Sequence, residues 1–208
     1  TVYVGANDGM LHAFDESGNE RWAYVPPTLM DNLWRLADKG YEINHRFYVD
    51  GPITVSDAYI GGSWKTILVG ALGKGGRGYY ALDITNPDSP KYLWSYTAGN
   101  NPNVGYSFGA PIITKLNGSW VVLVTSGHNN IPEGTKFLAA DGQGYVWALD
   151  AGSGVVVKTW STGRGSTAAP SGLASLNIKV ADFQIDNSVL AAYGGDLLGN
   201  LWRFKSDG

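Results

Sequence analysis

Cysteine is absent from the 208 residues of this chain, and charged side chains are scarce. Without cysteine the chain has no disulfides and no thiolate chemistry, which fits either redox compartment. Charged residues make up 16% of the chain, against about a quarter in an average domain. The net charge is only −3, and both signs are mixed along the chain. No basic stripe is available to neutralise phosphates, so we expect no nucleic-acid binding.

Long apolar runs are also missing. No stretch approaches the roughly 18 apolar residues of a membrane-spanning helix, so we expect no transmembrane segment in this chain. The N-terminus lacks the basic and apolar regions of a signal peptide. The chain starts at Thr1 in what reads as a strand, and we therefore expect it to be part of a longer protein.

Glycine and aromatic residues, by contrast, are abundant. The chain has 29 Gly, 8 Trp and 12 Tyr, and 44% of its residues are hydrophobic. Glycine supplies tight turns, while Trp and Tyr suit half-buried strands. This composition predicts an all-β chain with many turns and a sizeable core.

A hairpin pattern recurs four times along the chain. Each copy has a glycine, an alternating apolar strand and an aspartate, which is replaced by Lys205 in the last copy. The first three copies continue through a polar turn to a second strand that ends in tryptophan. The copies are GMLHAFDESGNERW, GYYALDITNPDSPKYLW, GYVWALDAGSGVVVKTW and GNLWRFK. Asp15, Asp83 and Asp150 are 68 and 67 residues apart, which indicates one structural unit per copy.

Further strand candidates lie between the hairpins, as runs rich in Val, Ile, Thr and Tyr that end at turn residues. Two such strands and one hairpin make a four-stranded unit, the size of a propeller blade, and propellers have about four to eight blades. We predict a single segment of a partial or irregular β-propeller, about three to four four-stranded blades of a larger ring. The predicted repeats cover 1–25, 47–97, 106–162 and 172–205, with an inter-blade insertion at 26–46.

The insertion contains the one plausible helix of the chain. It is expected over Asp31 to Ala37, with Asp31 as the N-cap. Because loops of this length rarely lack structure, we interpret the segment as a surface turn packed on a blade edge.

Three long motifs, in this order, resemble the signature of the PilC/PilY propeller family. They are FYVDGPITVSDAYIGGSWKTILVGALGKGGRGYYALDITNP, GYSFGAPIITKLNGSWVVLVTSGHNN and YGGDLLGNLWRF. This family belongs to the type IV pilus systems of bacteria. The resemblance implies a C-terminal propeller with irregular blades and a non-enzymatic role in pilus assembly, in opposing retraction, and in adhesion to host-cell or abiotic surfaces. It also implies export through the periplasm to the cell surface or pilus, with pilus subunits or minor pilins as partners.

Two other functions stay open at this point. The hairpin GYVWALDAGSG also resembles the repeat of quinoprotein-type propellers. A quinone-dependent dehydrogenase would resemble a full ring around its cofactor, and this chain has too few blades and no adjacent-cysteine disulfide. A periplasmic outer-membrane assembly scaffold shares the hairpin repeat but lacks the three long motifs. We therefore expect no enzyme activity and no bound cofactor.

The family resemblance implies one metal site, an EF-hand-like calcium loop before the Tyr-x-Gly-Asp-Leu motif. In the loop ADFQIDNSVLAAYGGDL, Asp182, Gln184 and Asp186 match the first, third and fifth positions. Leu190 stands at the ninth position, where the family has an acidic residue. Calcium affinity depends on the number of charged oxygen ligands, so we expect weak binding or none. The alternative is that the two aspartates cap a β-turn.

The run Gly73 to Gly78 has the G-x-G-x-x-G spacing of dinucleotide sites. Such a site needs a helix directly afterwards, and the next residues, YYALDIT, alternate as a strand does. We therefore predict a hairpin turn, with Lys74 and Arg77 at its tip, solvated or in contact with an acidic partner.

Tryptophans fall into two groups. Trp22, Trp94 and Trp160 end equivalent hairpins and are predicted to wedge between neighbouring sheets. Trp34 and Trp64 lie off the repeat, and with the loop residue His128 they form the candidate binding surface. Ordinary packing is the alternative for these residues. No two histidines share ligand spacing, which gives a zinc site no support.

Overall fold

The computed structural model describes residues 1–182 and 186–207. The first sheet contains β1 (Val2–Gly5), β2 (Leu11–Phe14) and β3 (Glu20–Tyr24). The second contains β4 (Ile53–Ile60), β5 (Ser63–Ala71), β6 (Gly78–Asp83) and β7 (Lys91–Thr97). The remaining strands are β8 (Ile112–Leu116), β9 (Ser119–Thr125), β10 (Tyr145–Asp150), β11 (Val156–Ser161), β12 (Asn177–Asp182), β13 (Asp186–Gly195) and β14 (Leu201–Lys205).

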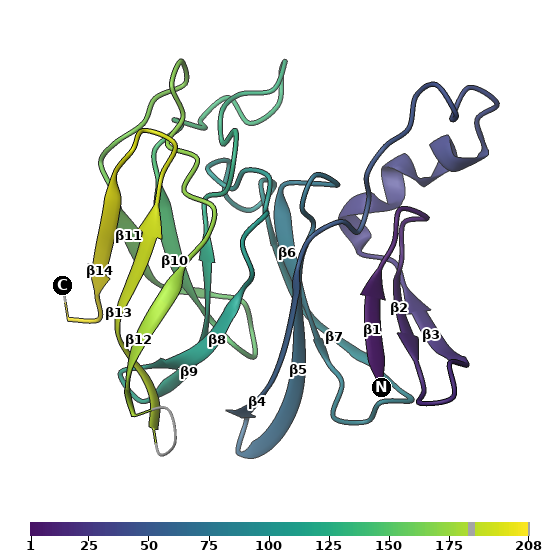
Figure 1. Ribbon diagram of the computed structural model, residues 1–208, viewed down its shortest axis with the longest axis horizontal. Helices are drawn as coiled ribbons and strands as arrows, with labels where there is room; N and C mark the ends of the chain where they lie inside the picture. The colour runs from purple at the N-terminus through teal and green to yellow at the C-terminus, as the bar shows by residue number, and fades with distance from the viewer. Residues whose placement is uncertain (183–185, 208) are drawn as a thin grey trace.

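The strands form antiparallel groups of three, four, four and three, in chain order. The last two groups join into one seven-stranded sheet through a single parallel pair, Ser188 with Lys115, between β13 and β8. Figure 1 shows the groups side by side across the molecule, with the two chain ends in the outermost groups. The predicted all-β arrangement of successive hairpin units is therefore present, while the residue bounds proposed for each repeat stay a prediction.

In the second sheet, β6 and the second half of β5 are buried on both faces, which explains their almost continuous apolar sequence. Because alternate residues of a strand point to opposite faces, Ile67 and Val69 on β5 pack into the core shared with β9 and β10. Leu68 packs on the other face, into the core shared with the first sheet. A third core lies between β9, β10, β13 and β14. Each core thus joins two neighbouring groups, as expected for stacked blades.

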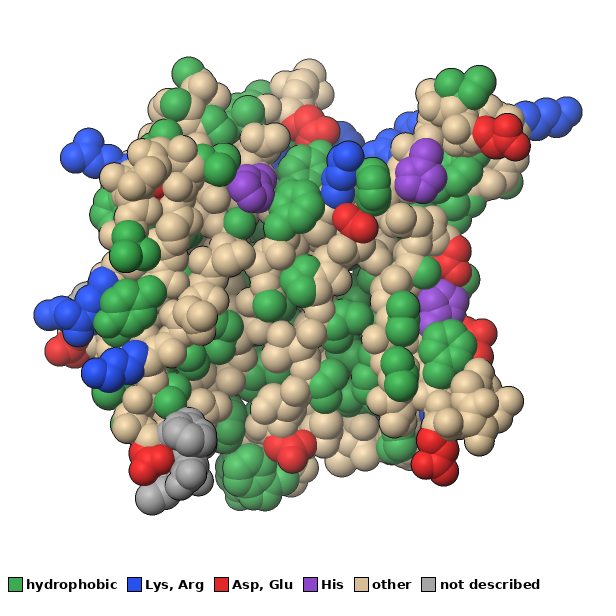
Figure 2. Space-filling view, in the orientation of Figure 1, with side chains coloured by type: hydrophobic (Ala, Val, Ile, Leu, Met, Phe, Trp, Pro, Cys, Tyr) green, Lys and Arg blue, Asp and Glu red, His purple; other side chains and the backbone are tan. Residues whose placement is uncertain are grey.

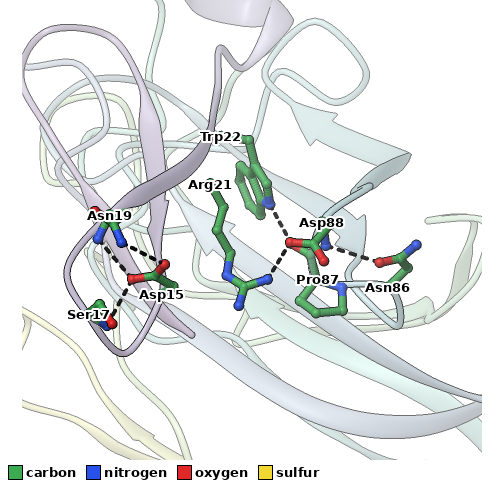
Figure 3. Close-up of polar contacts among 8 residues, drawn as sticks. All are labelled: Asp15, Ser17, Asn19, Arg21, Trp22, Asn86, Pro87 and Asp88. Atoms are coloured by element: carbon green, nitrogen blue, oxygen red, sulfur yellow. Dashed lines mark hydrogen bonds and ion pairs between the residues drawn. The ribbon is translucent and has the colours of Figure 1, made fainter.

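The tryptophans that end the repeated hairpins connect each group to the next. Every one of the three donates its indole N–H to a backbone carbonyl of the following group. The pairs are Trp22 to Pro87 at 2.7 Å, Trp94 to Ala151 at 2.9 Å and Trp160 to Lys205 at 2.9 Å. The first pair is accompanied by an ion pair between Arg21 and Asp88 (Figure 3). The prediction that these tryptophans wedge between neighbouring sheets is confirmed. Each one also links its group of strands to the next through the same indole hydrogen bond.

The repeated aspartates organise the hairpin turns that follow their strands. Asp15 Oδ1 accepts the backbone N–H groups of Ser17 and Asn19, at 2.8 and 2.9 Å (Figure 3). Asp150 and Asp83 likewise accept backbone N–H groups two residues further on. Aspartate is suited to this position because its short carboxylate reaches the backbone of the turn.

The helix in the insertion differs from the prediction. It is a 3₁₀ helix, η1, over Pro27–Ala37, and Asp31 lies inside it instead of capping it. Pro27 can begin the helix because proline lacks the N–H that is unsatisfied at the first helical position. Leu29 is buried, and the helix packs against the core between the first two sheets. None of the helices within 1–182 and 186–207 is long and apolar enough to cross a bilayer.

The glycine run between β5 and β6 is part of an antiparallel hairpin, as predicted. Gly75 is required by a close approach of two backbone segments. A Cβ atom at this position would lie 1.6 Å from the carbonyl oxygen of Tyr48. The glycine spacing therefore serves backbone packing, and no helix follows it.

Arg77 does not lie at a solvated tip, which corrects the prediction for this side chain. It is only 8% exposed, and its guanidinium lies 4.4 Å from the ring centre of Phe137. It donates to three backbone carbonyls, those of Val104, Pro102 and Ile131, at 2.8, 2.9 and 2.9 Å. Loops from two regions of the chain converge on it, so its role is internal.

His12 is held between two carboxylates on the first sheet. Its Nδ1 lies 2.8 Å from Glu20 Oε1, and its Nε2 lies 2.9 Å from Asp8 Oδ2. The hydrogen bond to Glu20, together with that to Asp8, raises the pKa of His12 above its usual 6.5, although burial of the ring opposes the shift. A raised pKa means that the folded state binds the proton more tightly than the unfolded state.

We expect the His12→Gln variant to be less stable than the parent protein mainly at low pH. The stabilisation is fully present below the unfolded pKa of about 6.5, and it is lost as the pH rises through the raised folded pKa. Urea unfolding at about pH 5.5 and pH 8.5 should show a larger free-energy difference between the two proteins at the lower pH. An equal free-energy difference at the two pH values would contradict the stabilisation of protonated His12 by Glu20 and Asp8.

Candidate binding surface

The three predicted surface residues lie in three separate places. Trp34 is on η1 and is 60% exposed, while Trp64 is at the start of β5 and is 61% exposed. His128 is partly buried in the loop after β9. Figure 1 places η1 and the free end of the β4–β5 hairpin at opposite edges of the molecule. The structure therefore offers separate candidate sites instead of one combined surface.

Trp64 is the centre of an aromatic group that spans two blades. Its ring lies 5.7 Å from that of Tyr59, its cross-strand partner, and 5.8 Å from that of Trp120 on β9. Both contacts are edge to face, with interplanar angles of 71° and 74°. This geometry is favourable for aromatic pairs, so the exposed Trp64 ring is held in place by its two aromatic neighbours.

Two tight turns fix the strands that carry this aromatic group. Gly61-Gly62 joins β4 to β5, and Asn117-Gly118 joins β8 to β9. All four turn residues have positive φ angles, between 50° and 85°. Turns with positive φ at both central residues match the twist of paired strands, and glycine and asparagine adopt this conformation most readily. The two hairpin ends are therefore rigid supports for their side chains.

A cleft of about 550 Å³ opens beside the aromatic group. It is bounded by the ends of the β4–β5 and β8–β9 hairpins and by the turn after β10. Tyr59, Trp64 and Trp120 supply its apolar surface, and Lys115 and Asp150 are among its polar side chains. Figure 2 shows hydrophobic side chains gathered at the exposed end of the β4–β5 hairpin.

Sequence reasoning identified Trp64 but missed its partner Trp120. A signal was present, because the triplet Gly-Ser-Trp occurs at 62–64 and again at 118–120. In each case the tryptophan is the second residue of a strand after a two-residue turn. Tyr59 and Lys115 are the matching cross-strand partners of the two tryptophans, so the site comes from the same position in adjacent blades.

His128 belongs to a second cluster of aromatic and basic side chains. Its ring packs edge to face with that of the exposed Phe108, at 5.3 Å. Phe47 lies in the same cavity, of about 420 Å³, with the ammonium of Lys74 4.4 Å from its ring centre. Residues from four separate segments of the chain thus meet here, a convergence that no local sequence pattern indicated.

The residues predicted to hold calcium lie where β12 meets β13. Asp182 and Asp186 are cross-strand neighbours, and Gln184 lies outside the described residues. Asp186 Oδ1 lies 3.5 Å from the ammonium of Lys115 and accepts a hydrogen bond from the Ser188 hydroxyl at 2.8 Å. Among residues 1–182 and 186–207, no three His, Cys, Asp or Glu side chains cluster in a way that could hold a metal. One of the two carboxylates predicted to hold calcium is therefore paired with an ammonium, and calcium binding at this loop stays a prediction.

We expect calcium to leave the melting temperature almost unchanged. A calcium site would add about 2.7 kcal/mol to the free energy of unfolding when the calcium concentration is about 100 times its dissociation constant. Thermal unfolding in millimolar calcium should match that in magnesium, for the parent protein and for Asp186→Ala alike. A clear rise with calcium that Asp186→Ala abolishes would contradict this expectation. Leu190→Asp restores the missing acidic side chain and, if the loop has the geometry of the family, should give the largest calcium response of the three proteins.

Comparison with known sequences gives one consistent result. The sequence model described as the PilY1 beta-propeller domain matches residues 1–207. A protein of Pseudomonas aeruginosa strain PAO1 named type IV pilus biogenesis factor PilY1 is 43% identical over 98% of this chain. A homologue from Xylella fastidiosa, named in the same way, is 39% identical over the whole chain. This chain spans 17% and 14% of the length of those two relatives.

Solved structures agree with the sequence comparison. The C-terminal domain of Pseudomonas aeruginosa PilY1 superposes with a TM-score of 0.77 and 39% identity, over 98% of this chain and 38% of that structure. BamB from Moraxella catarrhalis gives a TM-score of 0.53 at 19% identity, over 99% of this chain and 46% of its own. Quinohemoprotein alcohol dehydrogenase from Comamonas testosteroni also gives 0.53, at 18% identity, over 93% of this chain and 27% of its own. The last two show a shared propeller fold alone.

Proposed function

We propose that this chain, which belongs to the PilY1 β-propeller family, is a non-enzymatic part of the bacterial type IV pilus machinery at the cell surface. The observation that carries the proposal is the match of the family to residues 1–207, together with relatives named as pilus biogenesis factors. The matched stretch includes all the strands described above, so the likeness covers the whole fold.

The propeller acts, in this proposal, on the balance between pilus extension and retraction. Its partners are pilus subunits or minor pilins. Stacked sheets with three continuous cores form a rigid body, and such a body presents its turns and loops in fixed positions for recognition. These features support a role in holding an assembly intermediate, and the family relationship supports the pilus as the assembly.

Adhesion to host-cell or abiotic surfaces is the second part of the proposal. Trp64 and Trp34 are both exposed, and the cluster around His128 includes the exposed Phe108. Aromatic side chains dominate the binding energy of many interfaces. The clefts at Trp64 and at His128 are therefore the first places to seek an adhesion defect.

Bacteria that make the full-length protein without the region corresponding to residues 1–208 should carry fewer surface pili. The measurement is the amount of pilin sheared from cells, with total pilin and the truncated protein quantified in the same samples. Reintroducing the complete protein should restore the wild-type amount. Normal piliation with the truncated protein present at normal levels would defeat the proposal, whereas a defect confined to attachment would defeat its biogenesis part.

The non-enzymatic part of the proposal has its own test. The dehydrogenase with the same fold is only 18% identical, and fold likeness at that level does not carry a reaction with it. Purified protein with pyrroloquinoline quinone should oxidise alcohols and sugars no faster than the quinone alone. Turnover that scales with protein concentration would contradict this expectation.

A further inference from the structure

The cleft beside Trp64 combines flat aromatic surfaces with polar groups, and we propose that it binds a neutral carbohydrate. This inference rests on the adhesive part of the proposed function and names the ligand class of one site. Its volume of about 550 Å³ falls in the range of small-molecule sites, about 300 to 1,000 Å³. The site is therefore large enough for a short oligosaccharide segment.

The aromatic rings give the cleft its first recognition element. Single exposed apolar side chains are common on protein surfaces, but here Trp64 contacts both Tyr59 and Trp120, and the three rings come from two blades. Trp and Tyr provide rigid contact area with little loss of side-chain freedom. Such rings suit a ligand with flat C–H faces, which is how a pyranose ring presents its carbon skeleton.

Charged side chains are the second recognition element, and the cleft contains both a cation and a carboxylate. The Lys115 ammonium lies 5.4 Å from the ring centre of Trp120 and 3.5 Å from the Asp186 carboxylate. Asp150, which also lines the cleft, carries the other sign. With one cation and nearby carboxylates, the cleft favours an uncharged ligand that can both donate and accept hydrogen bonds.

Two other ligand types fit these observations less well. A quaternary ammonium group is bound by cages of aromatic rings, but the Lys115 ammonium in the cleft wall would repel it. A purely apolar peptide side chain would displace water from Asp150 and Lys115 without giving either a further hydrogen bond, and removing charged groups from water without compensation is unfavourable. Sugar hydroxyls satisfy both requirements, since they line the edges of an otherwise apolar ring.

The test uses the full-length protein on an array of immobilised neutral and acidic oligosaccharides. The strongest neutral probe is then titrated in solution, with tryptophan fluorescence as the readout. We expect binding of neutral probes, and loss of about tenfold or more in affinity for Trp64→Ala, as is usual for a central aromatic contact. Trp64→Phe should keep part of the affinity because it retains an aromatic face.

Tyr92→Ala is the matched control, because Tyr92 is also an exposed aromatic residue, at 51%, but lies on β7 and does not line the cleft. Its affinity should stay within about twofold of the parent protein, an energy change below about 0.5 kcal/mol. Equal losses in the two alanine variants, binding of acidic probes alone, or no bound oligosaccharide would each overturn the inference. If no oligosaccharide binds while the truncated strain still loses its pili, the carbohydrate site is wrong and the biogenesis function stands.

Discussion

Replacing Trp94 with alanine is expected to lower the free energy of unfolding by about 3 to 5 kcal/mol, the range for removing a large buried aromatic side chain. Trp94 is only 4% exposed and packs in the core shared by the second and third groups of strands. Its indole N–H donates to the Ala151 carbonyl at 2.9 Å, so alanine would leave both a cavity and an unpaired acceptor. Urea unfolding followed by circular dichroism measures the change.

Two variants separate these contributions for Trp94. Trp94→Phe keeps most of the ring volume but loses the donor, so it should destabilise the protein by about 1 to 3 kcal/mol, the cost of leaving a buried polar group unpaired. Trp34→Ala removes an exposed tryptophan and should stay within about 0.5 kcal/mol of the parent protein. A Trp94→Ala protein as stable as Trp34→Ala would show that the indole does not join the two blades.

Replacing Arg77 with methionine is expected to destabilise the protein by about 3 kcal/mol or more, since hydrogen bonds to charged groups contribute about 1.5 to 3 kcal/mol each and are not additive. The guanidinium donates to three backbone carbonyls from two loops. Burial lowers the pKa of Arg77, but arginine remains charged throughout the physiological range. Methionine would fill much of the space and satisfy none of the carbonyls.

Lysine at position 77 tests whether charge alone is sufficient. An ammonium is a point donor that cannot reproduce the planar fork of arginine, so Arg77→Lys should recover only part of the lost stability. Lys74→Met changes a neighbouring basic residue of the same hairpin, whose contact is to the ring of Phe47, and should have a much smaller effect. If Arg77→Lys matched the parent protein in urea unfolding, the bridging geometry would be disproved.

Much of the fold could be predicted from the sequence because its determinants are local and repeated. The hairpins carry turn residues at fixed places, and the alternation of apolar residues defines which strand faces are buried. The wedge tryptophans could be predicted for the same reason, since Trp22, Trp94 and Trp160 occur at one position of the repeat. The predicted helix start at Asp31 is wrong because Pro27, whose missing N–H suits the first helical position, already begins η1.

The sites were harder to predict because they depend on contacts between distant segments. Arg77 appeared to be a turn residue, and only the fold shows that the carbonyls of Val104 and Ile131 converge on it. Trp64 is predicted as a candidate binding residue, but its contact with Trp120 on the next blade has no local signal of its own. The ion pair of Asp186 with Lys115 likewise joins residues far apart in sequence. Such pairings follow from how blades stack, which the local pattern does not specify.

The most direct measurement of the central claim is the amount of surface pilin in strains with and without the retraction motor. If the propeller favours extension over retraction, deleting the region that corresponds to residues 1–208 should reduce surface pili in the strain that has the motor. Removing the motor as well should restore them at least in part. Wild-type piliation after the single deletion, with the truncated protein present, would contradict the account.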